Sequence, residues 1–485
     1  FTGRTLFGAK PPKGQEMDDH YFGVIKPRVA AYMDELNEEL WKLGILAKTE
    51  HNEVAPAQHE LAPIYTTTNI ATDHNQLTME IMQKVAAKHG LVCLLHEKPF
   101  AGVNGSGKHN NWSLATDKGV NLLSPGETPY ENAQFLLFLC AVIKAVDDYQ
   151  DLLRLSVATA GNDHRLGANE APPAVVSIFL GDELNGVLEA IENDTPYAGT
   201  EKTQMKLGVN VLPKFNRDTT DRNRTSPFAF TGNKFEFRMV GSRDSVAAPN
   251  VVLNTIVAEV FQEVCDELEK AEDFDMKVHD LIKQFASEHQ RIVFNGNGYS
   301  DEWVEEAKRR GLPNIRTTVE SIEYLTTEKT VELFEKFGVF TRAELESRAE
   351  IKYETYAKAI NIEARAMIDI ASKHIIPAVI KYITSLANSI NQVREACGDV
   401  GVSVQEELLK ESSELLAQTR KALKDLIVVT DEACQMQEGP AQAEFFKDRV
   451  VTGMQALREP VDALEMIVNK EMWPMPSYGD LLFEV

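Results

Sequence analysis

Two glutamates stand seven residues apart across a proline bend, in the segment HNEVAPAQHE of residues 51–60. If the bend lays its two arms side by side, Glu53 and Glu60 face one cation, and Mg²⁺ and Mn²⁺ prefer such hard oxygen ligands. A solvated acidic loop would show the same spacing, and for a glutamate pair taken alone that plainer interpretation is favoured.

A second cluster, NGSGKHNNWS, occupies residues 104–113. Its small residues let backbone approach a ligand closely, and His109 is a candidate metal ligand. Asn111 and Ser113 share one face of an expected strand and could meet a nucleotide. The spacing is not that of a P-loop. Alone, the cluster favours an ordinary hairpin.

The third cluster is NDHRLGANEAPP, residues 162–173. Arg165 offers a planar guanidinium that suits a carboxylate. Glu170 lies on a loop flanked by Gly and Pro and could close over a site as a gate. A surface ion pair between the two would give the same spacing.

The fourth cluster, RNRTSP of residues 222–227, precedes a strand-like stretch in which Lys234, Glu236 and Arg238 alternate to one face. An amphipathic sheet edge would alternate in the same way. Cationic groups around a carboxylate also fit a metal–phosphate site, where they neutralise phosphoryl oxygens.

Composition narrows the class of protein. The 485 residues suggest two to four structural units, and the formal charge of −24 argues against a nucleic-acid binder. No apolar run approaches the roughly 20 residues that span a bilayer. Five scattered cysteines without a CxxC pair favour a reducing cytoplasm. The start has neither an initiator Met nor a signal peptide, so we expect the chain to be a fragment.

The pattern of apolar residues predicts alternating helices and strands up to about residue 250 and mostly long amphipathic helices after it. Loops are expected near 295–315 and 397–402. The expected helices are 27–46, 71–89 and 129–156. The expected strands are 48–65 (bent at its prolines), 91–100, 175–180 and 233–240, and 104–114 is expected to be a loop followed by a strand.

Together and in this order, the four clusters resemble the glutamine synthetase family, over roughly residues 20–260. The sequence NRTSPFAFTGNKFEFR and the long helical C-terminal region resemble those of the type III enzymes, which are large bacterial forms that assemble as double-ring dodecamers. The resemblance implies an α+β fold: a catalytic domain over 1–260, with a curved antiparallel sheet and helices, then a helical C-terminal region over 261–485. Acidic amphipathic helices more often mediate contacts between copies of a chain than bind a separate partner, so assembly is favoured over an interaction module.

The resemblance also implies roles for individual residues. The substrates would be glutamate, ammonium and ATP, with Mg²⁺ or Mn²⁺ as cofactor. Arg165 would bind the α-carboxylate of glutamate, and Glu170 would close the flap. The full set would be Glu53, Glu60, His109 and Glu236 for metal; Tyr21, Asn104, Gly105 and Arg165 for glutamate and ammonium; Asn111, Ser113 and Lys234 for ATP; and Glu170, Arg224 and Arg238 for catalysis.

Two departures from the family pattern stand out. The family has two further metal-ligand glutamates upstream of DDHYFG and an N-terminal β-grasp domain, and neither is in this chain. Bacterial type I enzymes have a second Arg after the NR motif, where this sequence reads Phe228-Ala229-Phe230.

The resemblance explains why these residue types occur together. A carboxylate becomes reactive toward ammonia once ATP converts it to an acyl phosphate, and metals and arginines offset the crowded negative charge. Ammonium must lose a proton, for which Glu53 or Glu170 could serve. Two alternatives remain: a related ligase that joins glutamate to another amine, and a non-catalytic structural or regulatory relative.

Overall fold

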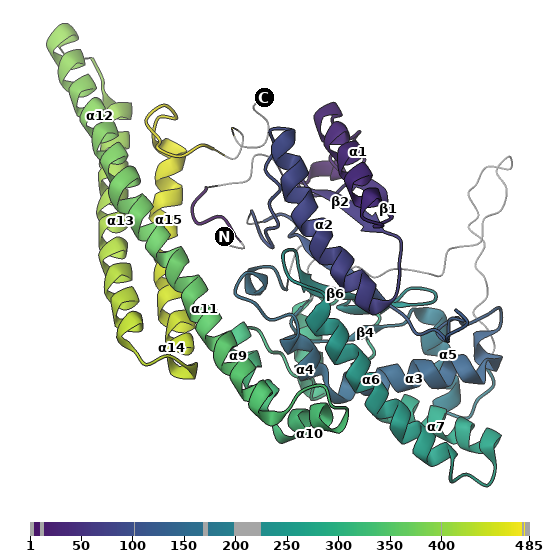
Figure 1. The fold of residues 1–485 in the computed structure, drawn as a ribbon. Coiled ribbons are helices and arrows are strands. Elements are labelled where there is room, and N and C mark those ends of the chain that lie inside the picture. The colour runs from purple at the N-terminus through teal and green to yellow at the C-terminus, as the bar shows by residue number, and fades with distance from the viewer. Residues whose placement is uncertain are drawn as a thin grey trace. The chain divides into compact units, whose positions relative to one another are not determined.

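A computed structural model describes residues 4–9, 14–100, 102–167, 173–197, 225–398, 400–477 and 480 (Figure 1). The chain forms two compact units that each combine separate stretches of sequence. Unit 1 contains Phe1–Ile64, Lys84–Gly105 and Glu346–Val485, and unit 2 contains Tyr65–Gln83 and Ser106–Leu345.

The N-terminal part of unit 1 packs one helix beside one hairpin. Helix α1 (Pro27–Lys42) begins with proline, whose fixed φ suits the first helical position, and buries Met33, Leu36 and Leu40 along one side. Strands β1 (Ala47–Asn52) and β2 (His59–Pro63) pair antiparallel, with His51 opposite Glu60. The predicted strand–bend–strand is confirmed.

The C-terminal part of unit 1 is a bundle of long helices. A π-helical turn (Ala371–Ile375) separates α11 (Arg342–Ile370) from α12 (Ile376–Cys397). Pro377 explains this turn. It has no N–H to donate to the carbonyl oxygen of Lys373, four residues earlier, and its ring would crowd that oxygen in a regular α-helix. The bundle continues with α13 (Ser403–Gln435), α14 (Pro440–Phe445), a second π turn (Phe446–Val450) and α15 (Val451–Ile467).

The beginning of the chain is bonded to α15. Arg458 donates to the carbonyl oxygens of Thr5 and Gly8 at 2.7 and 3.0 Å. Asp462 and Glu465 accept from the amides of Gly8 and Ala9, each at 2.9 Å. Unit 1 is therefore closed by contacts between its two ends in sequence.

Unit 2 is built on a four-stranded sheet in the order β3-β6-β5-β4. The β3–β6 and β5–β6 pairs are antiparallel, whereas β4 and β5 are parallel. Three phenylalanines, Phe228, Phe235 and Phe237, are fully buried, and the first two rings stack at 4.6 Å. The strands are β3 (Gly107–Trp112), β4 (Ile178–Phe179), β5 (Phe228–Phe230) and β6 (Phe235–Gly241).

Helices make up most of the rest of unit 2, and α3, α6 and α7 pack on one another (Figure 1). The helices are α2 (Thr68–Lys88, which continues into unit 1), α3 (Ala133–Asp148), α4 (Gln150–Leu155), α5 (Asp182–Glu192), α6 (Ala247–Leu268), α7 (Phe274–His289), α8 (Asp301–Arg309), α9 (Thr318–Ile322) and α10 (Glu328–Lys336).

The α+β class and the helical C-terminal region are confirmed, and three local predictions are wrong. Residues 91–100 form no strand, and Val92 is 81% exposed. The helix expected over 129–156 breaks at Tyr149, and α8 lies within the expected loop 295–315. The domain boundary near 260 falls inside α6 and stays a prediction.

In the part of the chain that the structure describes, no helix combines the length and apolar character that a bilayer crossing requires.

Candidate active site

The β1–β2 hairpin of unit 1 gathers three side chains that can ligate a metal. His51 lies in β1 directly opposite Glu60 in β2, and Glu53 follows β1 by one residue. One ligand atom from each of the three lies within 4.8 Å of the others, and all three residues are half-buried. Carboxylates with an imidazole are a donor set that Mn²⁺ and related cations accept. The hairpin therefore fits a divalent metal.

Charge within this cluster is partly balanced by His51. Its Nε2 contacts a Glu60 carboxylate oxygen, and its Nδ1 lies 2.8 Å from the carbonyl oxygen of Asn52. Burial lowers the pKa of His51, but the Asn52 carbonyl and the charges of Glu60 and Glu53 outweigh it and raise the pKa above its usual value. The carboxylates therefore favour the protonated form of His51, and a bound metal ion would compete with that proton.

The loop that precedes α1 supports the hairpin. His20 Nδ1 lies 2.6 Å from the carbonyl oxygen of Glu53, and Asn52 donates to the carbonyl oxygen of Gly23 at 3.1 Å. The ring of Tyr21 lies 5.8 Å from that of His51, edge to face. Tyr21, selected from the sequence, is therefore brought beside the acidic cluster.

Asn104 is tied to the same hairpin. Gln58, in the bend between the two glutamates, donates to the carbonyl oxygen of Asn104 at 3.4 Å. The Glu53 amide donates to the Gln58 carbonyl oxygen at 2.9 Å and closes the bend. Unit 1 thus brings together Tyr21, Glu53, Glu60 and Asn104; Gly105 is the next residue along the chain.

In unit 2, Glu236 and Arg238 lie on β6 and are each 2% exposed. Arg238 Nη2 lies 3.0 Å from Glu236 Oε2, and His109 Nδ1 lies 4.0 Å from the same oxygen. Because β6 is an inner strand of the sheet, the sheet-edge interpretation of this alternation is wrong. Two of the predicted metal ligands therefore meet in unit 2, and the other two meet in unit 1.

Successive side chains of strand β3 point to opposite faces, which decides where its predicted site residues lie. The inward side chains of Asn110 and Trp112 are bonded to Asn250 and Asn254 of α6, each at 2.9 Å. His109 and Asn111 consequently point to the other face of the strand. Asn111 pairs with Glu236 across the β3–β6 ladder.

Ser113 follows β3 and donates to the carbonyl oxygen of Asn233 at 2.9 Å. Asn233 immediately precedes Lys234, so these two predicted nucleotide-facing residues are close in unit 2. Lys234 is half-buried and its carbonyl oxygen accepts from Thr231.

Arg165 is 3% exposed and lies beneath β3. It donates to the carbonyl oxygen of Arg238 at 2.9 Å and to Asn162 Oδ1 at 3.3 Å. A Cβ on Gly107 would lie only 2.1 Å from Arg165 Nη2, so the glycine makes the space for the guanidinium. Glu170 and Arg224, also predicted from the sequence, lie outside the described residues.

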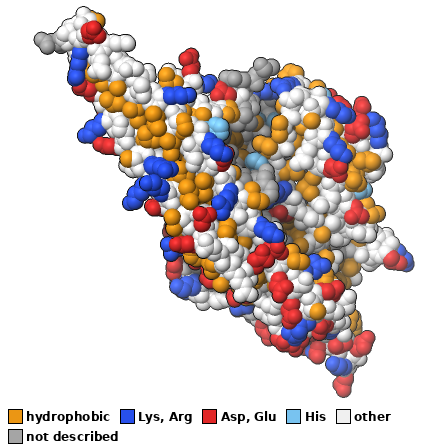
Figure 2. All heavy atoms as spheres, turned by 60° about the vertical axis from the view of Figure 1, so that its left-hand side comes forward, with side chains coloured by type: hydrophobic (Ala, Val, Ile, Leu, Met, Phe, Trp, Pro, Cys, Tyr) orange, Lys and Arg blue, Asp and Glu red, His pale blue; other side chains and the backbone are white. Residues whose placement is uncertain are grey.

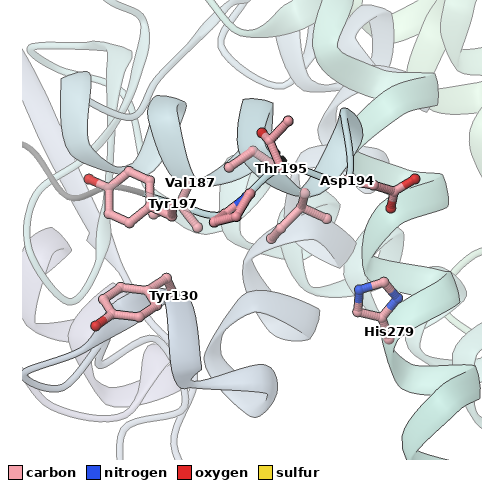
Figure 3. A pocket seen from close by; sticks show the side chains of 9 residues that line it. Tyr130, Val187, Asp194, Thr195, Tyr197 and His279 are labelled. Carbon is pink, nitrogen blue, oxygen red and sulfur yellow. Dashed lines mark hydrogen bonds between the residues drawn. The ribbon is translucent and has the colours of Figure 1, made fainter.

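Two further features lie away from these residues. A cavity of about 410 Å³ is lined by residues of α5, α7 and the loops beside them, and in Figure 3 Tyr130 and Tyr197 face each other on one side with His279 on the other. None of the residues that line it was selected from the sequence.

The second feature is the cluster of Asp147, Asp148 and His289, which also has metal-like spacing. Asp147, however, is already bonded to His289 at 2.8 Å and to Arg291 at 2.9 Å. These bonds occupy the Asp147 carboxylate, so the cluster is a structural contact that joins α3 to the end of α7.

Sequence reasoning did not select two residues of unit 1. The first is His51, whose signal was its two-residue spacing from Glu53 on an expected strand. The second is Gln15, whose side chain bonds Asn104 from 89 residues away. No local pattern in the sequence indicates that contact.

Comparison with known proteins agrees with these features. Residues 8–170 match the family model of the glutamine synthetase catalytic domain, and residues 277–394 match that of the glutamine synthetase C-terminal domain. The chain is 49% identical to a glutamine synthetase of Butyrivibrio fibrisolvens, over 100% of this chain and 69% of that protein. It is 47% identical to a type-3 glutamine synthetase of Dictyostelium discoideum, over 99% of this chain and 66% of that protein.

A solved glutamine synthetase of Plasmodium falciparum has a TM-score of 0.45 and 15% identity, covering 69% of this chain and 60% of that one. At this level the likeness supports no argument about the site.

The matched domains place the chain among the ligases. It belongs to the glutamine synthetase family. The chain spans about two thirds of the length of these curated relatives.

Proposed function

We propose that the protein joins ammonia to the γ-carboxylate of glutamate, with ATP converted to ADP and phosphate, through a γ-glutamyl phosphate. The observation that carries this proposal is the hairpin cluster of His51, Glu53 and Glu60 in a chain of the glutamine synthetase family. The reaction brings ATP, a carboxylate and ammonium together, and such a site needs fixed anionic ligands for cations.

The binding of glutamate is proposed for Asn104, Gly105 and Arg165. A guanidinium pairs with a carboxylate through two parallel bonds, and this suits Arg165 to the α-carboxylate. The support from the structure is that Arg165 and Asn104 are each held by hydrogen bonds within their own unit. A held side chain loses less entropy when the substrate binds.

The phosphoryl group is proposed to meet Arg238 and Arg224, while Asn111, Ser113 and Lys234 face ATP. Glu53, Glu60, His109 and Glu236 are the proposed ligands for Mg²⁺ or Mn²⁺, which would neutralise phosphate oxygens. Arg238 is already fixed by its pair with Glu236, so no large rearrangement of its charge is needed as negative charge develops.

Ammonium is proposed to bind beside Tyr21 and an acidic side chain. Glu53 or Glu170 would then accept its proton, because only neutral ammonia can attack the acyl phosphate. Glu53 is half-buried and clusters with His51, whose ring lies beside that of Tyr21. This position supports Glu53 as the proton acceptor. Closure by Glu170 would keep water from the intermediate.

We also propose that the protein is cytoplasmic and that it assembles as a homo-oligomer, a double-ring dodecamer. All five cysteines are free thiols, which agrees with a reducing compartment. Ile351, Ile362, Ile380 and Val428 are exposed on the long helices of unit 1. Figure 2 shows hydrophobic side chains gathered on the surface of one face. Such a surface suits contacts between copies of the chain.

The test measures glutamine formation by the full-length protein from glutamate, ammonium and ATP, with and without Mg²⁺ or Mn²⁺. We expect metal-dependent product that falls at least a hundredfold in Glu53→Ala and is unchanged in Glu346→Ala, an exposed glutamate of α11. Product only with a larger amine would replace this proposal with the related ligase. No product with any amine would support a non-catalytic relative.

A further inference from the structure

The side chain of Gln15 forms a paired contact with Asn104. Gln15 Nε2 donates to Asn104 Oδ1 at 3.0 Å, and Gln15 Oε1 accepts from the Asn104 backbone amide. Asn104 is 7% exposed, so these bonds are made largely out of water. Two bonds in parallel fix both the backbone and the side-chain rotation of Asn104.

The identity of each amide atom follows from chemistry. A backbone N–H is only a donor, so the Gln15 atom that faces it must be the oxygen. The other atom of that amide is then the NH₂ group, and the Asn104 atom that it meets must be an acceptor, Oδ1. The group that Asn104 has left to offer is its Nδ2, which only donates.

Gln15 is itself held in place. It is the residue before a 3-10 turn (Glu16–Asp18), and its carbonyl oxygen accepts from the Asp18 amide at 3.1 Å. Met17 and Asp18 follow with φ of 58° and 51°, a backbone shape that non-glycine residues adopt only when their surroundings fix it. The turn therefore fixes the backbone at Gln15, and the two bonds to Asn104 orient its amide.

From this pairing we propose that Gln15 is a positioning residue that sets the hydrogen-bonding polarity of Asn104, so that a donor faces the acidic substrate. The inference rests on the proposed function, in which Asn104 binds glutamate. A donor at this position favours a carboxylate or carbonyl oxygen of the substrate, whereas an outward Oδ1 would repel it. Gln15 would favour glutamate through the donor that Asn104 presents, without touching the substrate itself.

Gln15→Glu tests this directly because it keeps the shape of the side chain. Glu at this position can still accept from the Asn104 amide but cannot donate to Oδ1. Asn104 would then turn its Nδ2 toward position 15 and its Oδ1 toward the substrate. We expect KM for glutamate to rise by about tenfold or more, the size of a charge-assisted hydrogen bond, while KM for ATP and the melting temperature stay unchanged.

Two companion variants separate polarity from charge. Gln15→Met removes both bonds without adding charge and should raise KM for glutamate by a smaller factor, because Asn104 is then free to adopt either orientation. Gln418→Glu adds the same charge on exposed α13 and should leave KM unchanged. The Gln15→Glu effect should also persist at high salt, since screening weakens charge repulsion but not a reversed hydrogen bond.

Kinetics and glutamate-binding calorimetry on the full-length protein give distinguishable outcomes. Unchanged glutamate KM and affinity in both Gln15 variants would overturn the inference. An equal rise in KM for glutamate and ATP with a lower melting temperature would also overturn it, because it marks a structural role. If the wild-type protein binds glutamate in a Gln15-dependent way but forms no glutamine, the proposed function fails and the inference stands. If it binds no glutamate, both fail.

Discussion

Two of the three glutamates proposed for metal binding, Glu60 and Glu236, differ in what surrounds them. Glu60 of the hairpin has a side chain that is 42% exposed and is paired with His51, whose charge depends on protonation. Glu236 of β6 is 2% exposed and is paired with Arg238, which is always charged. The Glu60 carboxylate is therefore exposed to solvent, and its charge is neutralised only when His51 is protonated. The Glu236 carboxylate is buried, and its charge is always neutralised by Arg238.

The difference indicates a division of labour. An enclosed pair is fixed before any ligand arrives, and it stabilises a defined arrangement at the centre of the sheet. An open pair costs little to rearrange and can exchange its partner for a metal ion. Loss of the β6 pair should therefore reduce both stability and metal binding, whereas loss of the hairpin pair should reduce metal binding with little effect on stability.

The largest effect on stability is expected from Arg238→Met. Removal of the guanidinium breaks a buried ion pair by taking away one member, which typically costs about 3 kcal/mol or more. Urea unfolding should show this loss, and the double variant Arg238→Met with Glu236→Gln should recover part of it. If the urea midpoint of Arg238→Met equalled that of the wild type, the β6 pair would be no more important for stability than the hairpin pair.

Gly107→Ala probes the enclosed region without adding charge. The new Cβ would lie 2.1 Å from Arg165 Nη2, and the backbone of Gly107 does not need a positive φ, so the strain falls on the guanidinium. We expect Arg165 to be displaced and KM for glutamate to rise by about tenfold, as for a lost charge-assisted bond. Gly401→Ala, with nothing within 4 Å of its Cβ, is the control. Normal kinetics in Gly107→Ala would contradict the role of Arg165.

Asp163 is a second enclosed carboxylate with an arginine. Burial raises its pKa to about 6, although Arg154 and the bonds from Thr318 oppose the rise. Because the unfolded value is near 4, its contribution to stability is greatest below that pH and is lost as pH rises toward 6. The difference in unfolding free energy between wild type and Asp163→Asn should fall over this window and be flat above it. A constant difference from pH 4 to 7 would be incompatible with the raised pKa.

The smallest effect on stability is expected at the hairpin. Glu60→Gln removes an exposed pair with His51, and such pairs contribute about 0.5 kcal/mol or less. Thermal unfolding should be almost unchanged while metal-dependent glutamine formation falls strongly. A large loss of stability would show that the hairpin, too, is a structural pair.

The sequence predicted those features that depend on local pattern. Pro56 and the flanking alternation predicted the hairpin, and the clusters around His109 and Glu236 were predicted on their strands. Alternation alone could not separate an edge strand from the inner strand β6, because burial on the second face comes from other elements. Residues 91–100 are apolar enough for a strand, but a strand also needs a partner with which to pair.

Contacts across the sequence were beyond prediction from local pattern. Gln15 and Asn104 meet over 89 residues, and Arg165 reaches the carbonyl oxygen of Arg238 over 73. His51 was missed as a possible ligand because its role depends on the register that places it opposite Glu60.

The bonds between Arg458 and the segment around Thr5 also set an order of events during synthesis on the ribosome. Residues of unit 2 end at Leu345, so that unit can fold while the C-terminal helices are still being made. Unit 1 cannot close until α15 has emerged, more than 450 residues after Thr5. The hairpin with His51 precedes every strand of the unit 2 sheet in the sequence, yet it belongs to the unit that is completed last.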